Sequence, residues 1–234
     1  DGRFGTPLWS AGVFQPDFTP AFHADGRVYV GDQRGLHCFR PDGSRIWYHQ
    51  TGLPTRMAGT LDGDLLVVAE NHLFRLTADG KRSLWSFDGV APWTQPFVAV
   101  NRQLLVAHTI YGDVYALDPE TGELRWHDVF WVSSSGVSFT DADGDAWPDP
   151  CVVANAGEVL ILSGDDGSIL WSRNIRGFTG EAIPRFHDID GDGTPELLLA
   201  AQNSFAYAFR VERPSANSLH WPDFSVSHAL QAGR

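Results

Sequence analysis

Two acidic loops, residues 141–149 and 188–196, contain the residue types in this chain that are best suited to chemistry. Both follow the pattern Asp-x-Asp-Gly-Asp-x-x-x-Asp/Glu. Carboxylates at loop positions 1, 3, 5 and 9 and a backbone carbonyl at position 7 can converge on one hard cation, and Ca²⁺ takes about six to eight oxygen ligands in flexible geometry. Without an ion these carboxylates would repel one another. The pattern therefore predicts two calcium sites, with solvated acidic turns as the alternative.

The predicted ligands occupy those five positions of each loop. They are Asp141, Asp143, Asp145, Trp147 and Asp149 in the first loop, and Asp188, Asp190, Asp192, Thr194 and Glu196 in the second. Trp147 and Thr194 would contribute their backbone carbonyls. The Trp147 side chain is also expected to cap the first loop.

An EF-hand is excluded by the residues that follow each loop. That motif needs a bidentate Glu at loop position 12, between two helices. Position 12 is Val152 in the first loop and Leu199 in the second. The loops lead into short apolar runs, 151–154 and 197–201, of the kind that form buried strands. We therefore expect both loops to be turns between two β-strands.

The overall composition favours a globular protein that does not bind nucleic acid, and the calcium loops favour a location outside the cytoplasm. Of the 234 residues 43% are apolar, enough for a substantial core, and no apolar run reaches the length of a membrane span. The formal net charge is -12, and twelve of the 29 acidic residues lie in the segment 141–196, whereas a nucleic-acid surface should be basic. Weak calcium loops suit calcium-rich compartments. We therefore expect a secreted, periplasmic or cell-surface protein.

The two cysteines carry little functional information. Cys38 and Cys151 lie in separate strand-like segments. We expect two buried free thiols that behave as small hydrophobic side chains, with a disulfide as the alternative.

A repeat of about 40 residues organises the chain. Similar phrases end at Trp9, Trp47, Trp85, Trp126, Trp171 and Trp221, at intervals of 38, 38, 41, 45 and 50 residues. Tight turns such as Asp42-Gly43 and Asp166-Gly167 precede four of these tryptophans, and glycine adopts the positive φ of a hairpin turn without steric cost. Two further strand-like segments and an entry strand precede each turn. The predicted entry strands end near Phe22, Leu61, Phe97, Phe139 and Phe186.

Repeats of four short strands and about 40 residues are typical of β-propeller blades. We predict an all-β fold in which residues 1–234 form a single β-propeller domain of about five four-stranded blades. The predicted repeats are 10–47, 48–85, 86–126, 127–171 and 172–221. A sixth blade split between the two chain ends, an open fragment of a larger propeller and a two-sheet sandwich are the alternatives. The acidic loops fall between the first and second strands of their repeats, so calcium is expected to be structural.

Two families share these motifs. Gly112-Asp-Val-Tyr-Ala-Leu-Asp-Pro-Glu-Thr-Gly-Glu-Leu-Arg-Trp126 resembles the PQQ-type propeller repeat of quinoproteins, and segment 158–171 is a looser copy. The acidic loops resemble FG-GAP/VCBS repeats, the calcium-loop blades of integrin-α-like propellers. The resemblance covers roughly residues 10–224 and implies a propeller with two bound Ca²⁺ ions. It also raises a quinoprotein dehydrogenase, but those enzymes resemble this chain in the repeat only, since they have about eight blades and hold calcium beside the quinone.

No catalytic constellation is recognisable in the sequence. A ligand surface is expected instead at the loops that enter the innermost strands. Counting back from the predicted ends of the entry strands, Phe14, Leu53, Trp131 and Phe178 share one offset, and Trp93 falls four residues later. Aromatic faces beside polar groups suit sugar rings and protein partners. The predicted ligand-binding residues are Trp93, Arg56, Trp131 and Glu181. Gap-filling between blades is the alternative for Trp131.

The sequence thus predicts an extracytoplasmic, calcium-stabilised β-propeller that acts as a binding or assembly module for a glycan or a protein partner. The alternatives are a propeller enzyme that acts on glycans as a hydrolase or lyase, a degenerate quinoprotein, and a structural subunit of a larger complex. Two or more unpaired carboxylates that converge in the central funnel would favour an enzyme, and a broad apolar flank would favour the structural subunit.

Overall fold

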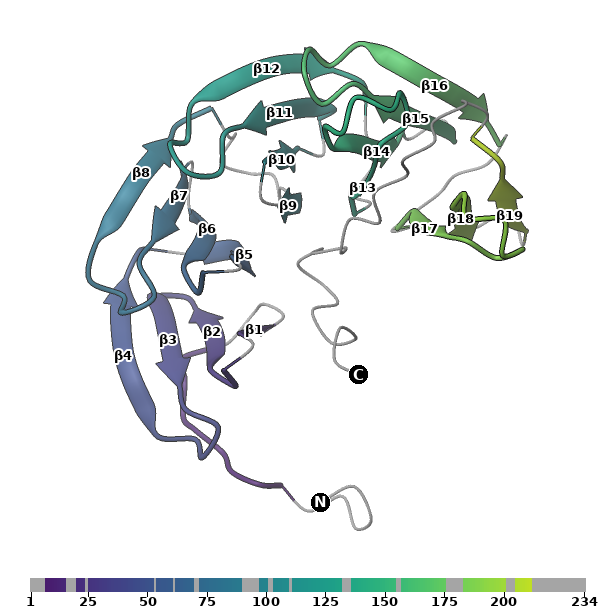
Figure 1. Cartoon of the computed structure of the whole chain (residues 1–234). Helices are drawn as coiled ribbons and strands as arrows, with labels where there is room; N and C mark the ends of the chain where they lie inside the picture. The colour runs from purple at the N-terminus through teal and green to yellow at the C-terminus, as the bar shows by residue number, and fades with distance from the viewer. Residues whose placement is uncertain are drawn as a thin grey trace. The chain divides into compact units, whose positions relative to one another are not determined.

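The fold of the described residues is entirely β (Figure 1). The computed structural model describes residues 7–15, 20–23, 25–52, 54–60, 62–69, 72–89, 97–100, 103–109, 111–131, 136–154, 157–175, 183–200 and 205–211. These residues form nineteen strands in five antiparallel sheets and no helix, so this part of the chain has no helix that could cross a membrane. The predicted all-β class is confirmed.

The chain divides into two compact units, residues 1–92 and 93–234. The first unit contains two sheets with strands in chain order. They are β1 (Ala21–Phe22), β2 (Val28–Asp32), β3 (Gly35–Phe39) and β4 (Arg45–Gln50), and then β5 (Pro54–Gly59), β6 (Leu65–Ala69), β7 (His72–Leu76) and β8 (Ser83–Phe87).

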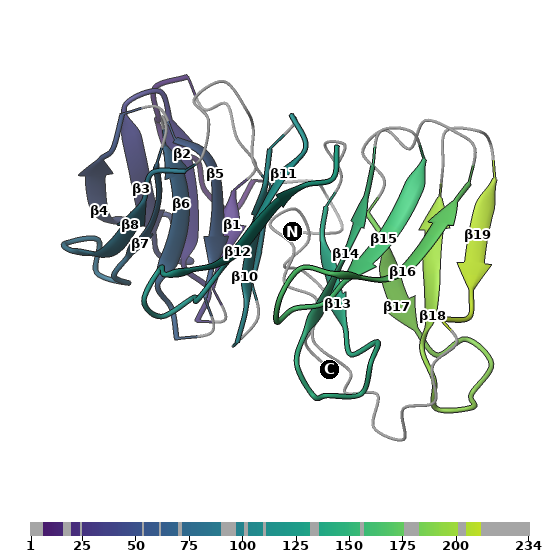
Figure 2. The same ribbon diagram turned by 90° about the horizontal axis from the view of Figure 1, so that it is seen from above.

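The second unit contains three sheets of the same meander topology (Figure 2). The first is β9 (Phe97–Val100), β10 (Leu105–His108), β11 (Asp113–Leu117) and β12 (Leu124–Val129). The second is β13 (Ser138–Thr140), β14 (Asp149–Val153), β15 (Glu158–Leu162) and β16 (Ile169–Asn174). The third is β17 (Arg185–His187), β18 (Glu196–Ala200) and β19 (Ala206–Phe209).

The five sheets correspond to the five predicted repeats. Four sheets have the predicted four strands, and the described part of the fifth has three. The fourth strand predicted before Trp221 lies outside the described residues, as do segments 1–6 and 212–234 at the two chain ends. The number of blades and the closure of the propeller therefore stay predictions, and so does the single domain.

One predicted boundary is wrong. Phe97 was expected near the end of the third entry strand, but β9 begins at Phe97 and ends at Val100. The whole run Phe97-Val-Ala-Val100 pairs with β10, with Val100 opposite Leu105 and Phe97 opposite His108. Because the run contains no turn residue, the ladder continues to its end.

In each unit a repeat tryptophan binds one sheet to the tight turn of the next. Trp47 Nε1 donates a hydrogen bond to the carbonyl of Ala78 at 3.1 Å, and a Cβ on Gly80 would lie 2.5 Å from its ring. Trp126 Nε1 donates to the carbonyl of Gly164 at 3.0 Å, and a Cβ on Gly167 would lie 2.8 Å from its ring. The sequence period therefore reflects one interaction, in which a tryptophan covers the tight turn of the following repeat.

The core lies between neighbouring sheets and comes from the inner strands. In the first unit, Tyr29, Leu36 and Leu65 are fully buried in one cluster. In the second unit, one cluster joins the sheets that contain β10 and β14, and another joins those that contain β14 and β18. Cys38 in β3 and Cys151 in β14 are buried and free, so the prediction of two free thiols is confirmed.

Candidate metal centres

Both acidic loops lie where the repeat predicted them, between the first and second strands of a sheet. Residues 141–148 connect β13 to β14, and residues 188–195 connect β17 to β18. The final carboxylate of each pattern, Asp149 or Glu196, is the first residue of the second strand. The ladder therefore holds one ligand of each predicted set in a rigid element.

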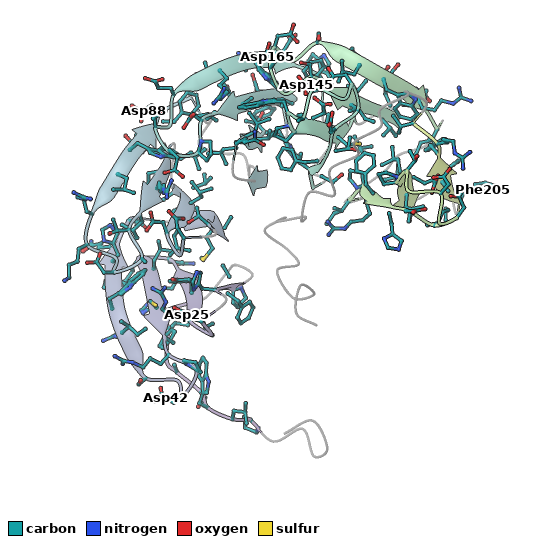
Figure 3. All side chains as sticks on the ribbon, in the orientation of Figure 1. Asp25, Asp42, Asp88, Asp145, Asp165 and Phe205 are labelled. Atoms are coloured by element: carbon teal, nitrogen blue, oxygen red, sulfur yellow. The ribbon has the colours of Figure 1, made fainter. Side chains whose placement is uncertain are left out.

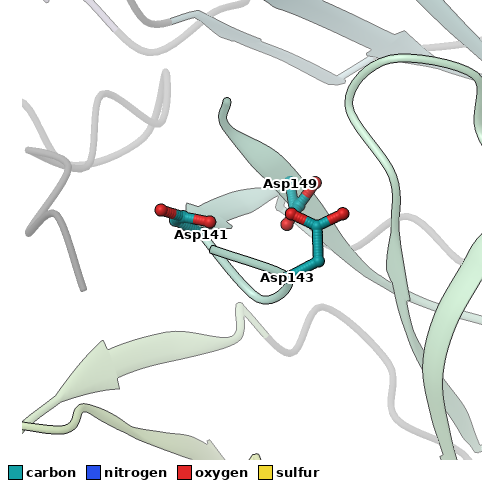
Figure 4. A group of neighbouring side chains, drawn as sticks. All are labelled: Asp141, Asp143 and Asp149. Atoms are coloured by element: carbon teal, nitrogen blue, oxygen red, sulfur yellow. The ribbon is translucent and has the colours of Figure 1, made fainter. Parts of the chain in front are cut away.

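Three carboxylates converge in the first loop. Asp141, Asp143 and Asp149 each offer an oxygen within 4.8 Å of the others (Figure 4). Asp141 and Asp149 are 5% and 1% exposed, and Asp143 is half-buried. Asp145, which is labelled in Figure 3, is exposed and does not belong to this group of three.

Backbone amides fold the first loop around its own carboxylates. Asp141 accepts hydrogen bonds from Gly144 N at 2.7 Å and from Ala146 N at 3.2 Å. Both donors have positive φ, 83° and 65°. Trp147 N donates to Asp145 Oδ1 at 2.7 Å. These backbone hydrogen bonds wind the loop around the Asp141 carboxylate.

Asp149 is held by two amides from different segments. Ala142 N donates to its Oδ2 at 2.7 Å, and Gly164 N donates to its Oδ1 at 2.9 Å. Burial nevertheless raises the pKa of Asp149 to about 7, to which the charges of Asp143 and Asp145 add. This site holds a carboxylate that is costly to ionise without a cation.

The Trp147 side chain packs against Arg125 and against the turn at Gly164. The Arg125 guanidinium lies 4.9 Å from the centre of its ring, and a Cβ on Gly164 would lie 2.6 Å from the ring. Its indole Nε1 is buried and has no hydrogen-bond partner. These contacts are with residues outside the loop, so the capping role of the Trp147 side chain stays a prediction.

The second loop repeats the first position for position. Asp188, Asp190 and Glu196 each offer an oxygen within 4.8 Å of the others. Asp188 accepts hydrogen bonds from Gly191 N at 2.7 Å and Gly193 N at 2.9 Å. Ile189 N donates to Glu196 Oε2 at 3.1 Å, as Ala142 N does to Asp149.

The hydrogen bonds of the second loop also order its remaining predicted ligands. Asp192 Oδ1 accepts from Thr194 N at 2.8 Å, and Asp190 Oδ1 accepts from Asp192 N at 3.2 Å. Backbone hydrogen bonds from Gly193 and Gly191 lower the pKa of Asp188. Backbone amides therefore hold the side chains of Asp188, Asp190 and Asp192 in place within the loop.

The two loops differ in charge compensation. In the described part of the chain, no lysine, arginine or histidine forms an ion pair with Asp141, Asp143, Asp145 or Asp149. In the second loop the Arg210 guanidinium contacts Asp190, Asp192 and Glu196. The first loop thus carries an unbalanced cluster of negative charge, and the second has a counter-ion of its own.

The donor sets fit a hard cation. Each convergent group consists of carboxylate oxygens, and neither contains a histidine nitrogen or a cysteine sulfur. Ca²⁺ prefers such ligands, whereas zinc sites commonly include nitrogen or sulfur. A bound cation would lower the free-energy cost of ionising the buried carboxyl group of Asp149.

In the second sheet, the turn between β5 and β6 is equivalent to the acidic loops and contains an ion-paired group that the sequence pattern did not predict. We call this turn and its ion pairs the β5–β6 corner. Ala78 N donates to Asp64 Oδ1 at 2.9 Å, as Gly164 N does to Asp149. Here the buried Arg75 of β7 pairs with Asp64 at 3.0 Å and with Asp62. An arginine within the apolar strand His72-Leu-Phe-Arg-Leu76 was the signal that could have revealed this ion-paired corner.

Of the four predicted ligand-binding residues, only Arg56 and Trp131 lie in the described part of the chain, so the ligand site stays a prediction. Trp131 is 69% exposed and has a φ of 52°. Arg56 lies in β5, and Trp93 and Glu181 lie outside the described residues. With β9 ending at Val100 and β13 at Thr140, Trp93 precedes its strand end by seven residues and Trp131 by nine, while Leu53 precedes the end of β5 at Gly59 by six. Trp93 therefore no longer departs clearly from the repeat, which was the reason to select it.

The antiparallel four-stranded sheets and the tryptophan-capped turns define a β-propeller built of PQQ-type repeats. Residues 1–221 match the family described as "Outer membrane protein assembly factor BamB". The match covers nearly the whole sequence, so the chain belongs to this family. No match is found among curated proteins.

Solved structures share the fold at low sequence identity. BamB from Moraxella catarrhalis is 16% identical with a TM-score of 0.62, over 82% of this chain and 60% of that one. BBS1N, solved in complex with ARL6DN, is 15% identical with a TM-score of 0.60, over 84% and 62%. The quinohemoprotein alcohol dehydrogenase ADHIIG from Pseudomonas putida HK5 is 16% identical with a TM-score of 0.55, over 84% and 41%. This chain therefore spans about 60% of the length of the BamB structure that it matches.

Proposed function

We propose that this protein is an extracytoplasmic propeller module that binds a protein partner within a larger assembly, and that Ca²⁺ stabilises two of its blade turns. The match of residues 1–221 to a family described by its role in outer membrane protein assembly carries the proposal. A second propeller of similar fold, BBS1N, was solved in complex with another protein. Both observations favour a protein partner over a glycan.

The family also supports the proposed location. Its description refers to the outer membrane, and calcium loops of modest affinity would be filled in compartments rich in calcium. The proposed location and the proposed metal support each other, because calcium-rich compartments would keep weak calcium sites occupied.

Calcium is proposed as a structural ion. The two groups of oxygen donors lie in turns between strands, and each includes a buried carboxylate at the start of the second strand. A bound cation would hold Asp141, Asp143 and Asp149 together and offset their repulsion. It would thereby fix a long turn where the first two sheets have shorter ones.

A thermal melt tests the metal. Purified protein is stripped with EDTA and then melted alone, with Ca²⁺ and with Mg²⁺. We expect Ca²⁺ to raise Tm more than Mg²⁺, because Mg²⁺ demands tighter octahedral geometry. Asp143→Asn and Asp188→Asn should each remove part of the gain, with Asp165→Asn as a control that neutralises an exposed carboxylate of a different turn. An unchanged Tm after EDTA treatment would show that the sites are not structural.

Site-specific photo-crosslinking tests the partner. A photoreactive phenylalanine analogue replaces the exposed Trp131, and the control carries it at Ile169, which is 55% exposed in β16. A protein captured from Trp131 in envelope extracts, and absent from the Ile169 sample, is the expected result. Equal capture from both positions, or capture of glycan alone, would contradict a protein-binding surface at the entry loops.

A further inference from the structure

The side chain of Arg210 contacts the second acidic loop at the carboxylates that would bind a cation. It follows β19 directly, and its Nη2 contacts Asp190 Oδ2 and lies 3.3 Å from Asp192 Oδ2. Its Nε lies 3.5 Å from Glu196 Oε1. One guanidinium therefore touches three of the four side-chain carboxylates that the loop pattern assigns to a metal.

The ion pair with Arg210 does not complete the hydrogen bonding of the buried Glu196 carboxylate. The residue is only 5% exposed, and its Oε1 makes no hydrogen bond shorter than the 3.5 Å ion pair with Arg210 Nε. A carboxylate oxygen of Glu196 lies within 4.8 Å of oxygens of Asp188 and Asp190. A buried carboxylate that faces other carboxylates and lacks a full hydrogen-bond complement is a site prepared for a stronger cation.

The register of the strands explains why only the second loop has this arginine. Leu197 of β18 pairs with Phe209 of β19, which places Arg210 beside Glu196. In the preceding sheet Cys151 pairs with Ile161, so the residue at the place of Arg210 is Ser163. The Ser163 hydroxyl accepts a hydrogen bond from Asp165 N at 3.2 Å and brings no charge to the loop. At this position the second loop therefore gains a positive charge from Arg210, where the first loop has a neutral serine.

In the second sheet a guanidinium group pairs with carboxylates at the turn between the first and second strands. There Arg75 pairs with Asp62 and Asp64, at the turn that is equivalent to the acidic loops. Arg75 is only 2% exposed, whereas the Arg210 side chain is 52% exposed. Arg75 is therefore a permanent part of its corner, and Arg210 can leave its loop for solvent at little cost.

We propose that Arg210 is a built-in counter-ion which Ca²⁺ must displace from the second loop, so that the two loops fill in order. Among the residues that the structure describes, the first loop has no such competitor, and it binds first. The second loop binds at higher Ca²⁺ concentration, and its filling releases the Arg210 side chain from the loop. This inference rests on the proposed calcium function and adds a graded response to it.

Calorimetric titration of the whole chain with Ca²⁺ tests the order of filling. We expect two steps in the wild type, with the tighter step absent from Asp143→Asn and the weaker step absent from Asp188→Asn. Arg210→Gln and Arg210→Met should both tighten the weaker step by about tenfold, since partly exposed ion pairs of this kind contribute modestly to binding equilibria. Arg173→Gln removes the same charge from an exposed position in β16 and should leave both steps unchanged.

The outcomes separate this inference from the calcium function itself. Two wild-type steps of equal affinity, or a weaker step that neither Arg210 variant tightens, would overturn the counter-ion role while calcium binding stands. One wild-type step together with a second step that appears in Arg210→Gln would support it. Absence of Ca²⁺ binding to every variant would refute both proposals.

Discussion

The pH dependence of the metal-free protein follows from the burial of Asp149. The pKa of this carboxyl is about 7 in the folded chain, against 3.8 for the ordinary group. Between these two values the folded state binds more protons than the unfolded state. The free energy of unfolding therefore falls as pH rises through this window, because ionising Asp149 in its buried site is costly.

The size of the effect can be worked from the same values. Between pH 5 and pH 7 the unfolded carboxyl is already ionised, while the folded one still holds its proton. That window spans about two pH units, and each unit corresponds to about 1.4 kcal/mol. We expect the EDTA-treated protein to lose about 2 kcal/mol between pH 5 and pH 7.5. For chains of this size that corresponds to a fall in Tm of roughly 4–8 °C.

The assay is thermal or urea unfolding at both pH values, in EDTA and in saturating Ca²⁺. Bound Ca²⁺ would hold Asp149 ionised and remove its part of the slope, so the gain from calcium should be larger at pH 7.5 than at pH 5. Asp149→Asn controls for the histidines that titrate in the same range. It should lower stability, because its amide group faces a backbone N–H, but it should flatten the slope. A metal-free slope that is identical in wild type and Asp149→Asn would show that Asp149 does not cause the pH dependence.

Three further outcomes are expected. Gly167→Ala should destabilise the protein by roughly 1–3 kcal/mol, because a methyl group there meets the Trp126 ring and the position has positive φ; urea denaturation measures this, and a neutral effect would contradict the packing. Replacing the buried Arg75 by Leu should cost about 3–5 kcal/mol, because two carboxylates lose their ion pair, and a stabilised variant would show that the pairing is dispensable. Burial raises the pKa of Cys38 to about 11, so thiol reagents should label Cys38 and Cys151 slowly in the native protein and fully in denaturant, and fast native labelling would argue against their burial.

Features set by local chemistry could be predicted from the sequence. The turn at Asp166-Gly167 was recognisable because Gly167 has a φ of 78° that few other residues adopt. The Trp126 position was recognisable because the ring packs on that turn at a fixed distance along the chain. The acidic loops were located between first and second strands for a similar reason, since their ligand pattern occupies nine consecutive residues.

Features that depend on strand register could not be predicted in this way. The ion pairs of Arg210 and Arg75 join residues that are far apart in the sequence, and only the pairing of strands brings them beside a carboxylate. The end of β9 was misplaced because the run Phe97–Val100 has no internal turn residue to mark a boundary. The same error led to the selection of Trp93, whose apparent departure from the repeat depended on that boundary.

The contact between one sheet's tryptophan and the next sheet's turn has a consequence for cooperativity. Trp47 with Gly80 and Trp126 with Gly167 are copies of one junction, and each ring and each turn belongs to its own repeat. The stability of such a chain is approximately a sum of repeat terms and nearest-neighbour coupling terms. Duplicating or deleting a whole repeat therefore preserves every junction, whereas losing one tryptophan uncouples two neighbours. Repeat number can thus change during evolution by tandem duplication, with no new interface required.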